Sequence, residues 1–441
     1  MKLKRGETWV KEDPFVHVLS QTERDSRCDF CFRRPENDIQ IPRCSSCKVV
    51  RFCNRKCQSS AWSVHKKECR SLKRVAPKIP TDSVRLIFRL LIKLESDIED
   101  VEVFGKKRNW ADLISHVDEV QEDQIRLQQF MVLMTTLKSF SENVMSMPSV
   151  EELFVIFGRV CVNSFSICDP EMNPIGVGVY IRQIKPCSVL DHSCRPNAVA
   201  VFEGTTLRIR CVEPVDSEQD LRISYIDTLD DTTTRRRNLQ QQYYFNCLCG
   251  ECKDSEKDLI KFSFNCTSVE CKGHVTQVPA DDRFSCDICG TTVDDVNLNQ
   301  AAEKAQKIIK HLNELKKQRE HESIRMKGLS CVSEMRAILH PYNVHFIKLC
   351  DLSLDACIET SQWDDALELG RLTVVAYRFY YGELHPSVGI LLFKIGKILS
   401  YLADREALQF LKQAATVLRV THGDDHSLYK DLAQLIDQNS N

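Results

Sequence analysis

Metal-binding side chains recur in pairs along one short stretch of the sequence. The pairs are separated by two or three intervening residues, and they are Cys28/Cys31, Cys44/Cys47, Cys53/Cys57 and His65/Cys69. Two sulfurs, or a sulfur and an imidazole, at this spacing can reach one tetrahedral Zn²⁺. Four pairs supply two closed sites and leave no open coordination position, which is typical of structural zinc rather than catalytic zinc.

A disulfide framework is the alternative interpretation of so many cysteines. Disulfides require an oxidising compartment. Met1 to Val10 lacks the apolar core of a signal peptide, and no run of about 18 apolar residues predicts a membrane span. We therefore expect a nuclear and cytoplasmic protein without membrane contact, in which paired cysteines bind metal.

Two further groups of cysteines follow the finger-like stretch. Cys247, Cys249 and Cys252 supply three thiolates, so a closed site needs one more ligand, for which Cys194 is the candidate. The second group is Cys266-x4-Cys271 with Cys286-x2-Cys289, which predicts a small zinc ribbon. The alternative for the second group is an exposed cysteine-rich loop.

The charge of the chain is unevenly distributed. The 441 residues carry a formal net charge of −2, whereas residues 27–78 contain 14 Lys or Arg and 4 Asp or Glu. A basic finger on an acidic body can make weak contact with nucleic acid or with acidic partners. The simpler interpretation, which we favour, is a solvated basic face that also compensates the negative charge of thiolate-rich zinc sites.

The apolar pattern around these clusters predicts an α+β chain with several domains. Ser83 to Leu94 has the pattern of an amphipathic helix, capped by Thr81 or Asp82, and helical patterning continues to about Phe157. Four short β-type runs follow from about Cys161, and they are Gly176 to Ile181, Ala198 to Phe202, Thr206 to Val212 and Leu221 to Ile226.

The C-terminal third predicts repeated helices. An apolar stripe at helical spacing is formed by Ala301, Ala305, Ile308, Leu312 and Leu315. Trp363 to Leu367 matches Asp404 to Leu408 at an offset of 41, and His385 matches His426 at the same offset. Such a period implies stacked helix pairs, because one pair cannot bury its apolar face alone. We interpret both histidines as structural turn residues.

The order of the remaining motifs closely resembles the SMYD family of SET-domain protein lysine methyltransferases, in which a MYND zinc finger interrupts the SET domain. The matching segments are N-S-F-S-I, G-V-G-V-Y, D-H-S-C-R-P-N, I-S-Y-I-D and Y-Y-F-N-C-L-C-G-E-C. The resemblance covers nearly the whole chain. It implies interleaved finger sites, with one zinc on Cys28, Cys31, Cys53 and Cys57 and another on Cys44, Cys47, His65 and Cys69.

The resemblance also implies a reaction and a set of site residues. S-adenosylmethionine would be the methyl donor and a protein lysine, for example in a histone tail, the acceptor. Tyr225 would orient the acceptor amine beside the cofactor, and Tyr243 would wall the lysine channel. The cofactor would contact Asn163, Asp191 and His192 and stack on Phe245. Cys194, Cys247, Cys249 and Cys252 would form the post-SET zinc site, which brings the expected number of zinc ions to three or four.

The domain organisation implied by the resemblance is sequential. It comprises an N-terminal SET segment (1–27), a MYND finger (28–69), a helical insert (77–160), a SET core (161–246), the post-SET site with the ribbon (247–295) and a tetratricopeptide-like helical domain (296–441). The finger would bind short peptides of partner proteins.

Two departures from the family pattern favour an alternative function. Leu3 to Pro14 resembles the segment that follows the family's glycine loop, so we expect that loop to be missing and cofactor binding to be weaker. Asp191 replaces an asparagine, and an ionised carboxylate only accepts hydrogen bonds. The alternative is therefore a catalytically impaired scaffold that binds peptides or chromatin partners.

Overall fold

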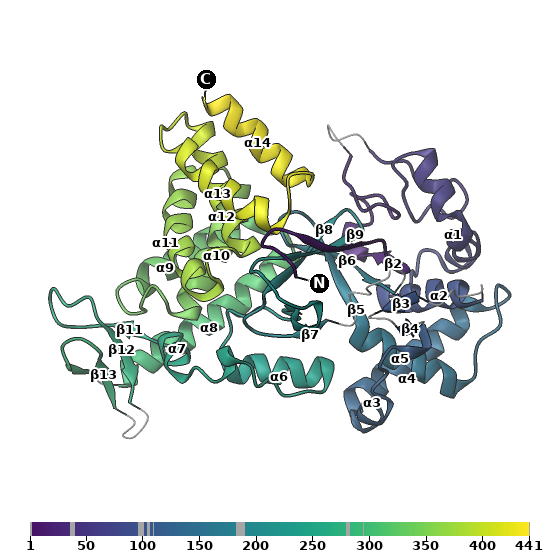
Figure 1. Ribbon diagram of the computed structural model, residues 1–441, viewed down its shortest axis with the longest axis horizontal. Helices are drawn as coiled ribbons and strands as arrows, with labels where there is room; N and C mark the ends of the chain where they lie inside the picture. The colour runs from purple at the N-terminus through teal and green to yellow at the C-terminus, as the bar shows by residue number, and fades with distance from the viewer. Residues whose placement is uncertain are drawn as a thin grey trace. The chain divides into compact units, whose positions relative to one another are not determined.

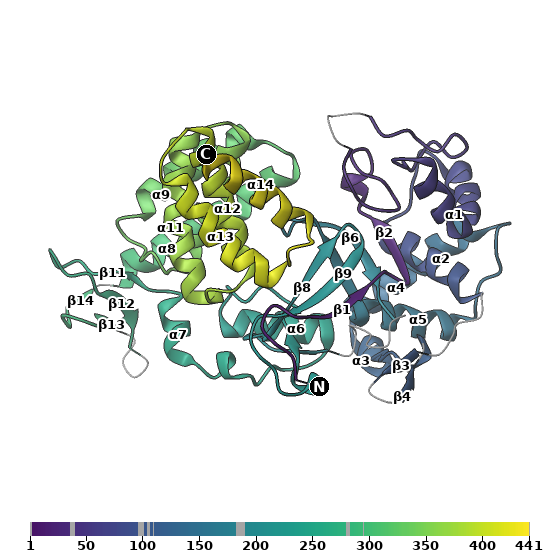
Figure 2. The ribbon, with the colours of Figure 1, turned by 45° about the horizontal axis from the view of Figure 1, so that its top comes forward.

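The computed structural model describes residues 2–35, 40–95, 101–103, 106–108, 110–181, 190–278, 283–293 and 295–440. They divide between two compact units, which Figure 1 and Figure 2 trace from the purple N-terminus to the yellow C-terminus. The first unit contains Met1–Asp191, Ala200–Arg222 and Leu239–Phe245. The second contains His192–Val199, Ile223–Asn238 and Asn246–Asn441.

Small sheets and a group of helices build the first unit. Its strands are β1 (Thr8–Glu12), β2 (Val16–Leu19), β3 (Val101–Val103), β4 (Lys106–Arg108), β5 (Ser164–Cys168), β6 (Pro174–Val179), most of β8 (Ala198–Glu203) and β9 (Thr206–Cys211). The sheet orders are β1-β9-β8, β2-β6-β5 and β3-β4. Its helices are α1 (Arg55–Val75), α2 (Asp82–Leu94), α3 (Val117–Glu122), α4 (Gln124–Ser141) and α5 (Val150–Asn163).

Most of the predicted elements of this unit are confirmed, with two differences. The strand predicted over Leu221 to Ile226 is wrong in extent, because β10 contains only Arg222–Ile223 and the chain then turns. The helical stretch predicted to reach about Phe157 is interrupted by the β3–β4 hairpin, and α5 continues to Asn163. A capping box at Ser149 and Glu152 starts α5, because each side chain accepts a hydrogen bond from the other residue's backbone N–H.

Helix α2 lies at the centre of the first unit. The amphipathic pattern is confirmed, but the face that carries charge is not solvated, since all nine residues from Val84 to Ile92 are buried. Arg85 and Arg89 are therefore inside the core, and both pair with buried carboxylates. A helix buried on every side is normally apolar all round, so these two arginines need a specific explanation.

The second unit consists of a short ribbon and a stack of helices. Its elements include the ribbon strands β11 (Phe264–Asn265), β12 (His274–Gln277), β13 (Phe284–Cys286) and β14 (Thr292–Val293), in sheet order β11-β12-β13-β14. Its helices are α7 (Ser255–Ile260), α8 (Asp295–Lys317), α9 (His321–Met335), α10 (Val344–Glu359), α11 (Trp363–Tyr381), α12 (Pro386–Tyr401), α13 (Ala407–Thr421) and α14 (Ser427–Ser440). Helices α11 to α14 pack in sequence order (Figure 1).

Three short elements lie where the chain passes between the units. They are β7 (Asp191–His192), β10, which pairs with β7, and α6 (Thr232–Tyr243). Among the described residues, every helix is either too short or too polar to span a bilayer.

The helical repeat predicted from the 41-residue offset is confirmed. Gly382 and Gly423, each at the turn after a helix, have φ values of +84° and +90°, which a residue with a side chain rarely adopts. His385 Nδ1 accepts the Ser387 N–H at 3.2 Å, and His426 Nδ1 accepts the Leu428 N–H at 3.2 Å. The two histidines are thus equivalent turn residues at the starts of α12 and α14.

Candidate functional site

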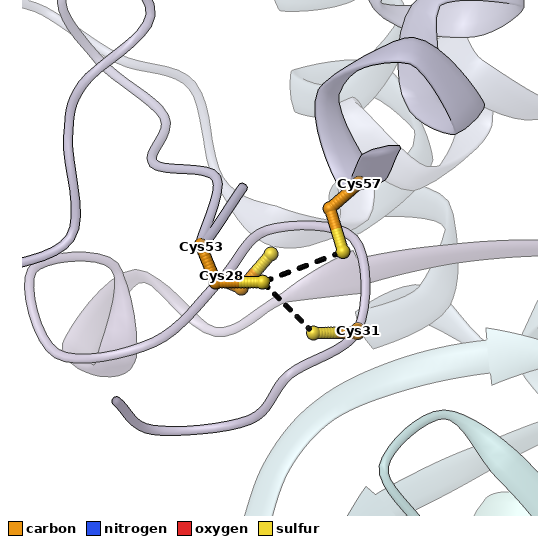
Figure 3. A group of neighbouring side chains, drawn as sticks. All are labelled: Cys28, Cys31, Cys53 and Cys57. Carbon is orange, nitrogen blue, oxygen red and sulfur yellow. Dashed lines mark hydrogen bonds between the residues drawn. The ribbon is translucent and has the colours of Figure 1, made fainter. Parts of the chain in front are cut away.

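The first finger cluster joins four cysteine sulfurs around one point (Figure 3). Cys28 and Cys31 lie in a turn before the finger loop, while Cys53 and Cys57 flank the start of α1. Asn54 caps this helix by accepting the Cys57 N–H at 2.8 Å. The Cys31–Cys53 and Cys53–Cys57 sulfur distances are 3.8 Å and 3.4 Å.

These distances distinguish between zinc and disulfides. A Zn–S bond of about 2.3 Å in a tetrahedron places the sulfurs about 3.8 Å apart, whereas a disulfide requires about 2.05 Å. In the second cluster, Cys44 and Cys69 are 3.8 Å apart, and His65 Nε2 lies 3.5 Å from the Cys44 sulfur. Cys47 completes this set. The ligands therefore interleave as the family resemblance implied, and both donor sets fit zinc.

A buried ion-pair network lies directly behind the second finger cluster. The Glu68 carboxylate is 3.6 Å from His65 Nδ1, the ring nitrogen that faces away from the sulfurs. Glu68 also accepts from Arg85 Nε at 2.9 Å and from Arg89 Nη2 at 2.7 Å. Burial alone would raise the pKa of Glu68, but the two arginine charges hold this pKa well below its usual range. Glu68 thus lies beside a candidate zinc ligand while it compensates two buried cations.

A third cluster joins Cys194 to the three cysteines that follow α6, namely Cys247, Cys249 and Cys252. The Cys194 and Cys252 sulfurs are 3.5 Å apart. The buried Arg235 donates to the Cys252 sulfur at 3.7 Å, and its positive charge offsets part of the −2 charge of a tetrathiolate zinc site. The Arg236 guanidinium donates to the Cys247 and Cys252 carbonyls at 3.1 Å each.

The ribbon carries the fourth cluster. The Cys266–Cys289 sulfur distance is 3.5 Å and the Cys271–Cys286 distance is 3.7 Å. Glycine is required at position 273, because a Cβ there would lie 2.5 Å from the Cys286 sulfur. Few large side chains are buried in this small sheet, chiefly Phe264, Val275 and Phe284, so a metal would supply much of its stability.

We predict four zinc ions in each folded and reduced chain. Metal analysis by mass spectrometry should return four, and Cys266→Ser should return three, because the ribbon cluster shares no ligand with the others. The control is Cys331→Ser, which changes a buried cysteine of α9 outside all four clusters, and it should keep four. Two or fewer zinc ions in the wild-type chain would contradict this assignment.

His192 connects the third cluster to Tyr225. The Tyr225 N–H donates to His192 Nδ1 at 3.1 Å, and His192 Nε2 lies 3.2 Å from the Cys194 sulfur. Burial and the positive charge of Arg235 lower the pKa of His192 to about 4, so the ring is neutral at pH 7. Since Nδ1 accepts, Nε2 carries the hydrogen and donates to the sulfur. Both ring nitrogens are thus engaged within the protein.

The other predicted cofactor and channel residues belong to the first unit. Asn163 ends α5, and its amide donates to the Ile114 and Arg159 carbonyls at 2.8 Å each. The Asp191 carboxylate is 77% exposed and lies 3.7 Å from the Arg222 guanidinium. The Asn163 amide oxygen and the exposed Asp191 carboxylate can therefore accept hydrogen bonds from a ligand.

Tyr243 and Phe245 flank a residue with an unusual backbone conformation. Tyr244 has a φ of +59°, and its hydroxyl lies 3.4 Å from Asp123 Oδ2. The aromatic ring of Tyr244 is also 5.5 Å from that of His116. Burial raises the pKa of Tyr243, so its phenol stays neutral. The contacts of Tyr244 therefore fix the backbone between Tyr243 and Phe245 at the end of α6.

The charged residues that support the clusters were not predicted from the sequence. Glu68, Arg85 and Arg89 occupy helical positions that normally predict a solvated face, and nothing in their spacing indicates burial. Arg235 was also missed, although it lies in the arginine run 235–237 shortly before Cys247. The positive charges of this run, shortly before a cysteine-rich motif, could have indicated that an arginine compensates the thiolates.

Known proteins are similar to this chain both in the finger and over nearly its whole length. A family model for the MYND finger matches residues 28–69. The chain is 31% identical over 439 residues to histone-lysine N-methyltransferase SMYD3 of Homo sapiens, covering 99% of this chain and 93% of that protein. It is 29% identical over 455 residues to histone-lysine N-methyltransferase ASHR1 of Arabidopsis thaliana, covering 98% and 90%.

A third relative is named as a lysine methyltransferase without reference to histones. The chain is 25% identical over 426 residues to N-lysine methyltransferase SMYD2 of Homo sapiens, covering 96% of this chain and 91% of that protein. All three relatives are named as lysine methyltransferases, and the alignments extend over nearly the full length of each. Together with the interleaved finger ligands, these similarities establish that the chain belongs to the SMYD family of SET- and MYND-domain proteins.

Proposed function

We propose that the chain is an S-adenosylmethionine-dependent protein lysine N-methyltransferase. The observation that carries the proposal is the link from Cys194 through His192 to the backbone of Tyr225, because it ties the proposed catalytic tyrosine to a zinc-capable cluster. When bound, S-adenosylmethionine supplies a methyl group on a positively charged sulfur. The task of the protein is then mainly to position the acceptor and to keep it reactive.

The side chains in the first unit have the chemistry that this cofactor requires. Phe245 offers an aromatic face for an adenine ring. The exposed Asp191 carboxylate can accept from an ammonium group, and the amide oxygen of Asn163 provides a further acceptor. The aromatic ring and the two hydrogen-bond acceptors therefore match the adenine and the polar groups of the cofactor.

The acceptor lysine must lose a proton before it can act as a nucleophile. The Tyr225 hydroxyl would accept a hydrogen bond from the amine and orient its lone pair. Tyr243, whose pKa is raised by burial, would form a neutral wall of the lysine channel, as the family resemblance implies. A neutral and partly dry surrounding disfavours the ammonium form of lysine, so the two tyrosines together favour the reactive amine.

The proposed partners are proteins. Substrates would be histone tails or other proteins that present a lysine, in both nucleus and cytoplasm. The finger would bind peptides of partner proteins through a surface that includes Trp62, which is 44% exposed. Any contact of the basic finger with nucleic acid would be weak and would diminish with salt.

Isothermal titration of the zinc-loaded chain with S-adenosylmethionine tests the proposal without a known substrate. We expect saturable binding of one cofactor per chain, which Phe245→Ala weakens by removing the proposed stacking surface. The control is Phe410→Ala, because Phe410 lies in α13 and contacts Arg371. Absent binding would favour the scaffold function, whereas equally strong binding in Phe245→Ala would remove Phe245 from the proposed cofactor site.

A further inference from the structure

The segment that carries Tyr225 has little regular structure of its own. Strand β10 ends at Ile223 and α6 begins at Thr232. Before Tyr225, the Ser193 N–H donates to the Ile223 carbonyl at 3.0 Å. His192 then holds the Tyr225 N–H, as described above. The conformation of the segment after Tyr225 must therefore come from other contacts within the second unit.

Ser224 makes local hydrogen bonds to the backbone of Ile226, and the next contact comes from the helical repeat. The Tyr381 hydroxyl donates to Asp227 Oδ1 at 2.6 Å. The same oxygen accepts the Leu229 N–H at 3.0 Å, so Asp227 closes a turn and binds Tyr381 with one atom. Burial and the Asp227 charge raise the pKa of Tyr381 well above its usual range. The phenol therefore stays protonated and remains a donor at neutral pH.

Tyr381 is itself held in place. It is the last residue of α11, and its ring stacks on that of His385 with centroids 4.4 Å apart and planes inclined by 11°. The Tyr377 ring packs edge-on at 5.1 Å. His385 is fixed in turn by the Ser387 N–H. The hydroxyl of Tyr381 is thus presented to Asp227 from a rigid corner between α11 and α12.

The far end of the same segment has several anchors that do not depend on Tyr381. Lys261 donates to the Asp230 carbonyl at 2.6 Å and to the Thr228 carbonyl at 3.4 Å, while Lys348 pairs with the Asp230 carboxylate. Asp227 lies between these anchors and Tyr225, two residues from the proposed catalytic side chain. Loss of the Tyr381 bond should therefore affect Tyr225 without releasing the whole segment.

We propose that Tyr381 is a positioning residue for methyl transfer, which acts through Asp227 to fix the turn that carries Tyr225. This inference rests on the proposed function. It gives the C-terminal helical repeat a role in the reaction, because a helix corner far along the sequence determines the placement of the residue that orients the acceptor amine.

Steady-state kinetics of Tyr381→Phe test the positioning role. The substitution keeps the stacked ring and removes only the donor, so we expect kcat to fall about tenfold, since small misplacements of reacting groups are costly. The Kd for S-adenosylmethionine should not change. The control is Tyr401→Phe, which alters a 74% exposed tyrosine at the end of α12 and should leave kcat unchanged.

Two variants of Asp227 make the test specific. Asp227→Asn retains an oxygen acceptor and should keep most of the wild-type kcat, whereas Asp227→Ala should lower kcat at least as much as Tyr381→Phe, because it also removes the acceptor of the Leu229 N–H. The double variant Tyr381→Phe/Asp227→Ala should be no slower than Asp227→Ala alone, because the Tyr381 hydrogen bond is already lost in that single variant. A wild-type kcat in Tyr381→Phe, or fully additive losses in the double variant, would overturn the inference.

Hydrogen exchange measured by mass spectrometry separates positioning from unfolding. Tyr381→Phe should accelerate exchange in the peptide that contains Leu229 and leave the ribbon and α14 unchanged. Acceleration throughout the second unit would mean a general loss of stability and would overturn the positioning role. A wild-type chain without methyltransferase activity would contradict the proposed function itself, whereas an active wild type with an equally active Tyr381→Phe would contradict only this inference.

Discussion

Replacing Glu68 with alanine is expected to destabilise the first unit by about 3–5 kcal/mol, because the substitution leaves two buried arginines without their shared partner. The side chains of Arg85 and Glu68 are both fully buried at 0% exposure, and Arg89 is 7% exposed. Asp29 remains as a partner for both arginines, but one carboxylate cannot compensate two desolvated cations. Urea denaturation of the zinc-loaded chain measures the loss.

A surface ion pair in the same unit supplies the control. Glu142 pairs with Arg74 at 3.2 Å but is 64% exposed, so Glu142→Ala should change stability by less than about 1 kcal/mol. Glu68→Ala should also release zinc to a chelator faster, since His65 loses its neighbour at Nδ1. Equal effects of the two substitutions would show that the buried network contributes no more than a surface pair.

Replacing Tyr225 with phenylalanine is expected to lower kcat by about 10²- to 10³-fold, or about 3–4 kcal/mol, as when one preorganised hydrogen-bond partner is removed from a reacting centre. The hydroxyl is proposed to act on the acceptor amine, so the Kd for S-adenosylmethionine should change little. The backbone N–H of Tyr225, which binds His192, is unaffected by the substitution. The fold should therefore persist.

Kinetics and calorimetry on the same preparation measure both quantities. Tyr401→Phe is a suitable control, because it removes the hydroxyl of a tyrosine that is 74% exposed at the end of α12. An unchanged kcat in Tyr225→Phe would remove this residue from the mechanism. A loss of cofactor affinity as large as the loss of kcat would instead assign its hydroxyl to the cofactor.

Short-range patterns predicted much of this molecule. The zinc-ligand pairs were recognisable because each pair, such as Cys44 and Cys47, is defined by local spacing. The 41-residue offset located the helical repeat, since equivalent turns need the same residues at Gly382 and Gly423. The interleaving of the finger pairs came only from the family resemblance, because spacing alone does not determine which pairs share a metal.

Long-range contacts account for what the sequence could not predict. The β-type run from Leu221 was predicted to extend three residues beyond Ile223, the last residue of β10. The strand ends earlier because the Tyr225 N–H binds the side chain of His192 instead of a backbone carbonyl. Arg89 has the helical position of a solvated residue, but Asp29 and Glu68 accept its hydrogen bonds inside the core. Such pairs depend on tertiary packing, which overrides local pattern.

Transfer of an isotope-labelled methyl group tests the central claim most directly. The zinc-loaded wild-type chain would be incubated with methyl-deuterated S-adenosylmethionine and with histones and other lysine-rich proteins, followed by mass spectrometry of the acceptor peptides. We predict labelled methyl groups on lysine side chains with the wild-type chain and almost none with Tyr225→Phe. A wild-type chain that binds the cofactor but labels no lysine would contradict the account and indicate a binding scaffold.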